Sequence, residues 1–269
     1  SGGAGGSTRL RLDIAYDGAA FSGWARQPGL RTVQGALEAA LATVFTRWGE
    51  PPLLTVAGRT DAGVHATGPV AHPDLTSVQW DALAAKRGSG RSPLDGLVKR
   101  VNGIAAPEGD VVVTRASVAP EGFGAGLSGG GRRYRYRLAD GGAGVEPRRR
   151  LDTTSGRGRL DAAAMDAAAQ TLIGLHDFAA YCKPRDEATT IRTLLQYDWH
   201  RDHRGLLTPH VRADAFRFSL VRSLDRPFFG RREGRFSPHA VVSIPVAPTL
   251  TTASYVAAAR AWNPPPLRY

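Results

Sequence analysis

The sequence predicts an α+β fold made of two successive units, each of which mixes strands and helices. Three observations support this prediction. Apolar and polar residues alternate in several short segments, which is typical of half-buried strands, and apolar residues recur at helical spacing in others. A glycine-rich stretch at 122–131 separates the two sets. The chain has 269 residues, of which 42% are hydrophobic, enough for one large domain or two of ordinary size.

The first unit opens with an alternating strand at 9–16. A helix is expected after Thr32, whose hydroxyl suits an N-cap, because apolar residues then recur at helical spacing: Val33, Leu37, Leu41 and Val44. The other expected elements are strands at 53–57, 65–72 and 110–115 and a helix at 96–104. The order strand, helix, strand, strand, helix, strand is that of a split βαβ, or ferredoxin-like, unit.

The second unit has a similar element order without a similar sequence. Expected strands lie at 132–138, 191–200, 206–213 and 250–256, and expected helices lie at 160–172 and 215–224. Asp161 stands near the start of the first of these helices. We place the boundary between the units near Ala119. This gives an N-terminal subdomain at 9–119 and a C-terminal one at 120–269, after a flexible glycine-rich tail at 1–8.

The charge of the chain favours a polyanionic partner. At pH 7 the formal net charge is +11 and the isoelectric point is about 10.6, so nucleic acid is the first candidate. Most of the basic residues are arginine, whose planar fork suits phosphate. The single cysteine, Cys182, excludes a disulfide framework and a cysteine-rich zinc site, and it fits a reducing, cytoplasmic setting. No segment approaches the ~20 apolar residues of a membrane span.

The segment Gly58–Ala66 is the strongest candidate for a chemical site. It follows the apolar segment 53–57 directly and carries Arg59, Asp61 and His65 between glycines. An arginine two residues from an aspartate can keep the carboxylate ionised, as a nucleophile or a base requires. An ordinary surface turn with an ion pair explains the same residues equally well.

The segment Arg132–Arg137 alternates arginines with tyrosines. On a strand, Tyr134 and Tyr136 share one face and the arginines share the other. Rings that stack on bases beside guanidinium groups that bind phosphates are typical of a nucleic-acid surface. A solvated edge strand, kept from aggregating by its charges, is the competing interpretation.

Two other patterns carry weaker hypotheses. The glycines at 122–126 lack the Lys-Ser/Thr ending of a phosphate-binding loop, so a hinge or an RNA-facing loop is favoured there. Asp61, His65 and His72 are possible metal ligands of a phosphoesterase, although their spacing fits no common zinc signature. Cys182 has no histidine placed to activate it and is interpreted as a bystander.

Taken together, these motifs resemble the TruA family of tRNA pseudouridine synthases. The matches run in order along most of the chain: Tyr16–Gly18, Gly23–Trp24, Thr32–Gln34, Gly58–His65, Arg132–Tyr136, Leu175–Phe178, Thr190–Arg192, Ala213–Phe216 and Leu220–Arg222. The sequence departs from the family where an arginine is replaced by Gly126, and again in the segment 217–250.

The resemblance implies two ferredoxin-like halves forming one continuous antiparallel sheet, with helices packed on one face and an active-site cleft between the halves. It also implies a homodimer that binds the anticodon stem-loop of tRNA and needs no metal or organic cofactor. In the implied reaction a uridine is flipped out of the stem and isomerised to pseudouridine. A tRNA-binding or folding protein without catalytic activity, on the same scaffold, is the alternative.

The resemblance also assigns roles to particular residues. Asp61 matches the catalytic aspartate, acting as nucleophile or as the base of a glycal pathway. Arg59 matches the residue that pairs with it and fills the space of the flipped base, and Tyr134 matches the tyrosine that stacks on the uracil. The residues assigned to substrate binding are Thr60, His65, Arg132, Arg133, Arg222 and Leu250.

Overall fold

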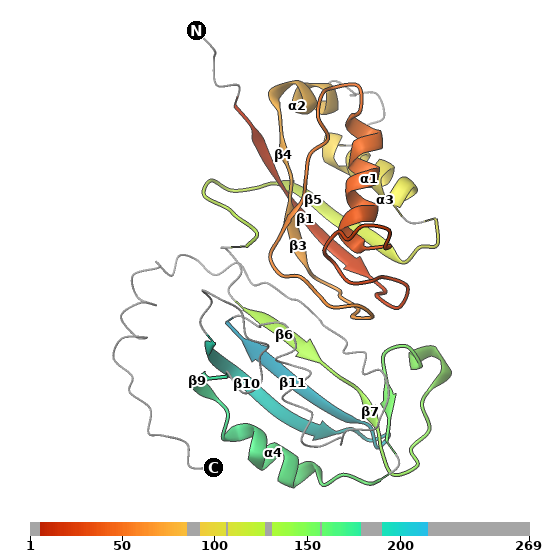
Figure 1. Cartoon of the computed structure of the whole chain (residues 1–269), viewed down its shortest axis with the longest axis vertical. Helices are drawn as coiled ribbons and strands as arrows, with labels where there is room; N and C mark the ends of the chain where they lie inside the picture. Colours follow the sequence, from red (N-terminus) through yellow and green to blue (C-terminus); the bar gives the residue numbers. More distant parts are fainter. Residues whose placement is uncertain are drawn as a thin grey trace.

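The computed structural model describes residues 6–84, 92–105, 107–126, 131–156, 158–178 and 190–214. Their fold is α+β, as the sequence predicts, with two groups of elements that follow one another along the chain (Figure 1). In the described residues, no helix combines the length and the apolar character that crossing a membrane requires. Several predictions lie outside the described residues: the helix at 215–224, the strand at 250–256, and the placements of Cys182, Arg222 and Leu250.

The first group is built on an antiparallel sheet in the order β2-β3-β1-β4, with β5 also paired to β1. Its strands are β1 (Thr8–Tyr16), β2 (Thr55–Val56), β3 (Val70–His72), β4 (Asp74–Leu75) and β5 (Val111–Val118). Strands β2 and β3 are shorter than the expected segments 53–57 and 65–72. The chain between them is irregular and forms the Gly58–Ala66 loop.

Three helices belong to this first group: α1 (Val33–Phe45), α2 (Ser77–Ala84) and α3 (Pro93–Ala105). The prediction for α1 is confirmed down to its cap, because the Thr32 hydroxyl accepts a hydrogen bond from the Gly35 amide. Alternate residues of β1 are buried against residues of α1 and α3; the buried set includes Leu10, Leu12, Ile14, Leu37, Leu41, Leu97 and Val101.

The second group is built on a sheet in the order β8-β7-β11-β10-β9, with β6 also paired to β11. Its strands are β6 (Arg132–Arg135), β7 (Leu138–Ala139), β8 (Thr154–Ser155), β9 (Gly174–Asp177), β10 (Ile191–Arg201) and β11 (Leu207–Ala213). A 3₁₀ turn (Pro147–Arg149) precedes β8, and α4 (Ala162–Gln170) packs on β10. Asp161 is the N-cap of α4, as expected.

Two expectations differ from what is observed. Within the described residues the strands form two hydrogen-bonded sheets rather than one continuous sheet, and the β7–β8 pair is parallel rather than antiparallel. The single strand expected at 132–138 is divided into two strands, β6 and β7. Its tyrosines, Tyr134 and Tyr136, are buried in the second core instead of forming an exposed stacking surface, because α4 and the large residues of β10 cover that face.

Candidate active site

The Gly58–Ala66 loop begins where β2 ends, and the second group of elements holds its start. Arg132, the first residue of β6, donates from Nη2 to the carbonyl oxygen of Ala57 at 2.6 Å. Its guanidinium lies so close to Gly58 that a Cβ added there would be 2.6 Å from Arg132 Nε. A side chain at position 58 would therefore displace the Arg132 guanidinium from this position.

The loop is also held by the segment that follows β1. The Trp24 amide donates to the carbonyl of Thr60 at 3.0 Å, and the Gly63 amide donates to the carbonyl of Phe21 at 3.3 Å. A Cβ on Gly18 would lie 2.0 Å from the carbonyl oxygen of Val64, so this approach also needs glycine. Two motifs that are distant in sequence, at 16–24 and 58–66, thus form one rigid unit.

Asp61 is half-buried in this loop, and its charge acts on Tyr134 of β6. Burial raises the pKa of the Tyr134 phenol, the charge of Arg132 opposes that change, and the charge of Asp61 reinforces it. The phenol is therefore neutral at physiological pH. The structure brings Asp61, Arg132 and Tyr134 into one neighbourhood, as the resemblance implies.

Thr60 lies on the inner side of the loop rather than facing solvent. Its hydroxyl is buried and forms a hydrogen bond of 2.7 Å with the hydroxyl of Tyr16. Burial raises the pKa of Tyr16 well above its usual range, and the contact with Thr60 partly opposes this. Thr60 thus connects the loop to β1 through this hydrogen bond. The assignment of Thr60 to substrate binding did not predict this structural role.

His65 connects the two groups of elements. The ring is buried; Nδ1 lies 2.9 Å from Asp17 Oδ1, and Nε2 lies 3.0 Å from the carbonyl oxygen of Leu151. A carboxylate and a carbonyl both accept, so the ring donates to both when each nitrogen carries a proton. His65 therefore has partners within the protein, from the turn after β1 and from the segment before β8.

Arg59 and Arg133 are the exposed cations of the site. Within the described residues Arg59 forms no ion pair, with Asp61 or with any other carboxylate, so the expected Arg59–Asp61 pair is not formed. The Arg59 side chain is exposed, whereas Asp61 is half-buried. Leu250 and Arg222 lie outside the described residues.

The metal-site hypothesis for Asp61, His65 and His72 is wrong for the conformation seen here. His72 Nδ1 accepts a hydrogen bond from the Ala125 amide, and the partners of His65 are Asp17 and Leu151. Among the described residues, the ligand atoms of Asp198, His200 and His210 converge, and those of Asp61, His65 and His72 do not.

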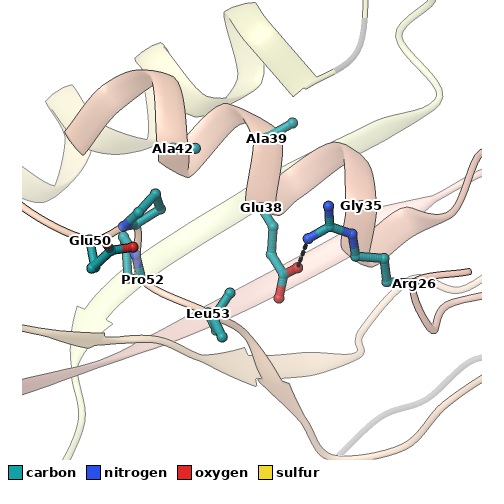
Figure 2. Close-up of a pocket in the computed structure, with 9 residues that line it drawn as sticks. Arg26, Gly35, Glu38, Ala39, Ala42, Glu50, Pro52 and Leu53 are labelled. Atoms are coloured by element: carbon teal, nitrogen blue, oxygen red, sulfur yellow. Dashed lines mark ion pairs between the residues drawn. The ribbon is translucent and has the colours of Figure 1, made fainter. Parts of the chain in front are cut away.

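A pocket of about 340 Å³ lies between α1 and the segment 50–53, apart from these residues (Figure 2). In it, Glu38 points toward Arg26, with 3.9 Å between Oε2 and Nη1. The other oxygen, Oε1, accepts from the Leu54 amide at 3.0 Å. Glu38 thus holds the chain that leads into β2. None of the residues that line the pocket is a predicted site residue.

Comparison with known proteins accounts for this arrangement. A family model described as tRNA pseudouridine synthase matches residues 168–259, which include the divergent segment 217–250. Among proteins named tRNA pseudouridine synthase A, one from Leifsonia xyli subsp. xyli is 53% identical over 240 residues, covering 88% of this chain and 83% of its own. One from Frankia casuarinae is 47% identical over 234 residues, covering 87% and 79%. One from Streptomyces griseus is 48% identical over 223 residues, covering 81% and 73%.

The family model and these relatives define an RNA-modifying isomerase of the pseudouridine synthase class. Within that class, the chain belongs to the TruA family of tRNA pseudouridine synthases.

Proposed function

We propose that this chain isomerises uridine to pseudouridine in the anticodon stem-loop of tRNA, with Asp61 as the reacting carboxylate. The observation that carries the proposal is the position of Asp61. It lies half-buried in a loop that both groups of elements hold, and its charge acts on the neutral phenol of Tyr134. A carboxylate held in place beside a buried ring suits a reaction that breaks a glycosidic bond and handles the released base.

In the proposed reaction the bond between N1 and C1′ breaks, the uracil turns, and a bond forms between C5 and C1′. The proton leaves C5 and N1 is protonated. Asp61 attacks the ribose or removes a ribose proton to start a glycal route. Tyr134, which is buried in this structure, becomes accessible on RNA binding, stacks on the uracil and relays the C5 proton, for which its neutral hydroxyl is suited. Leu250 packs on the other face of the base.

The target base must leave the helix before Asp61 can reach it, at a cost of about a few kcal/mol. Arg59 is exposed and unpaired with Asp61, so its guanidinium is available to fill the vacated place in the stem. Arg133 and Arg222 bind phosphates beside it, and each charged contact offsets part of the unstacking free energy.

We also propose that both subdomains, 9–119 and 120–269, are ferredoxin-like, with the active-site cleft between them. In the first, β3 lies between β1 and β2, and β1 lies between β3 and β5, which is the interleaving of a split βαβ unit. In the second, β11 lies between β6 and β10.

Tritium release tests the catalytic proposal. With a tRNA transcript labelled at uridine C5, the parent protein is expected to release the label, because C5 loses its hydrogen when the new bond forms. Asp61→Ala is expected to release none while still binding tRNA. Asp81→Ala, which removes an exposed carboxylate on α2, is the matched control and is expected to keep full activity.

Two outcomes would count against the proposal. Activity of Asp61→Ala within a few-fold of the parent would remove Asp61 from the reaction. Binding of tRNA without release by the parent would favour the alternative of a tRNA-binding protein that has lost its chemistry.

A further inference from the structure

The β10–β11 hairpin carries two histidines and an aspartate on one face. The strand register places Asp198 directly opposite His210, and His200 follows Asp198 by two residues, so all three side chains project from the same side of the sheet. One ligand atom from each lies within 4.8 Å of the other two. Their face is the one opposite Tyr197 and Trp199, which are buried in the second core.

Asp198 is the centre of this cluster. Its Oδ2 atom lies 2.7 Å from His200 Nε2 and 3.3 Å from His210 Nδ1. The oxygen is buried, and these two imidazoles are its charged neighbours among the described residues. The other oxygen, Oδ1, accepts from the side-chain amide of Gln196, which fixes the carboxylate. Such an anchored carboxylate is typical of metal ligands.

We propose that Asp198, His200 and His210 bind one divalent transition-metal ion of the Zn²⁺, Co²⁺ or Ni²⁺ class. Two imidazoles and one carboxylate are a donor set that such ions prefer, whereas Mg²⁺ and Ca²⁺ take oxygen ligands. Ligands about 2 Å from a common ion lie roughly 3 Å from one another, close to the two distances found around Oδ2.

The surroundings determine how open and how tight the site is. His200 is 66% exposed, so an ion can enter from solvent and keep a position for water or a phosphate oxygen. Arg135 of β6 stands opposite His210, and its charge acts on that ring. A cation therefore binds here more weakly than in a closed structural zinc site, and an anionic fourth ligand stabilises it.

Cobalt titration tests the proposal on the full chain without a histidine tag, after treatment with a chelator. We expect one Co²⁺ per chain, visible absorption bands, and their loss when Zn²⁺ is added. His200→Ala, which removes an exposed side chain, is expected to weaken Co²⁺ binding at least tenfold, and His210→Ala is expected to do the same. His203→Ala, in the turn of the same hairpin, is the matched control and is expected to bind as the parent does.

The proposal is overturned if millimolar Co²⁺ produces no absorption bands, or if both variants bind it as tightly as the parent. Circular dichroism of each variant shows whether the fold is retained. If His210→Ala is unfolded, because His210 is the more buried of the two, the test rests on His200→Ala. The readout is metal binding and not catalysis, so it is independent of the outcome for Asp61.

Discussion

At the scale of the residue, Tyr134 and the nearby charge of Asp61 carry most of the proposed chemistry. The ring is buried and its hydroxyl neutral, so stacking and proton relay can be separated by removing the oxygen alone. Tyr134→Phe is expected to keep tRNA affinity and KM within a few-fold and to lower kcat by about 100-fold or more, the usual size of a lost acid–base group.

Steady-state tritium release with labelled tRNA measures both constants. Tyr136→Phe is the matched control, because Tyr136 is buried two residues further along the chain. It is expected to retain the parent's kcat. A kcat for Tyr134→Phe equal to that of the parent would limit Tyr134 to stacking.

Substitution of Gly126 by arginine tests whether this chain has lost a contact with RNA. Among the described residues, a Cβ at Gly126 meets only the carbonyl oxygen of Val56, at 3.9 Å, so this part of the structure accommodates a side chain. Val56 ends β2, next to the loop of Asp61. Gly126→Arg is expected to tighten tRNA binding several-fold and to steepen the dependence of log K on log salt by about 0.9, the effect of one more phosphate contact.

Filter binding over a series of salt concentrations measures this slope. Gly126→Gln has a polar side chain without the charge and is the control. It is expected to leave the slope unchanged. If Gly126→Arg binds with the parent's slope, position 126 does not face the RNA backbone.

At the scale of the element, Asp140 joins three parts of the second subdomain. The carboxylate follows β7, pairs with Arg201 at the end of β10, and accepts from the Leu160 amide before α4, at 2.6 Å. Its hydrogen bond with Arg201 is the main reason that the pKa of Asp140 falls to about 2. The folded state thus favours the ionised carboxylate relative to the unfolded state.

The sign of the pH effect follows from this lowered pKa. The stabilisation is fully present above the unfolded pKa of about 4, and it is lost as the pH falls through that value toward the folded pKa of about 2. Asp140→Asn is expected to lower the free energy of unfolding by about 2 kcal/mol at pH 7 and by much less near pH 2. Urea unfolding at both pH values checks this. An equal loss at both would mean that the charge is not responsible.

The elements also differ in how far sequence could predict them. Helix α1, with its Thr32 cap, and the β10–β11 hairpin were predicted because their signals are local. Helix α2 was missed, although Thr76 and Gln79 form a reciprocal capping box that the sequence displays. Strand β9 was missed because four half-buried or exposed residues carry no periodic signal, and only pairing with β10 defines it.

At the scale of the whole molecule, the resemblance to the TruA family predicts a homodimer. A mass of twice the 28.6 kDa of one chain is expected from light scattering coupled to size exclusion, at micromolar concentration without RNA. The net charge of +11 makes low salt favour nonspecific complexes, so nucleic acid must be removed first. A mass of one chain under these conditions would contradict the predicted homodimer.

The sequence by itself determined the α+β class, most of the long elements and the loop that carries Asp61, because periodicity, caps and motifs are written within a few consecutive residues. It also indicated the nucleic-acid partner through the excess of arginine. These signals are local and do not depend on the tertiary contacts that each segment makes.

Only the tertiary structure decided which residues meet. Arg132 holds the start of the loop, His65 joins the two groups of elements, and Arg59 is exposed and forms no ion pair with Asp61. The cluster of Asp198, His200 and His210 likewise depends on the register of two strands. Strand pairing and burial are set by the whole chain, so no local spacing predicts these contacts.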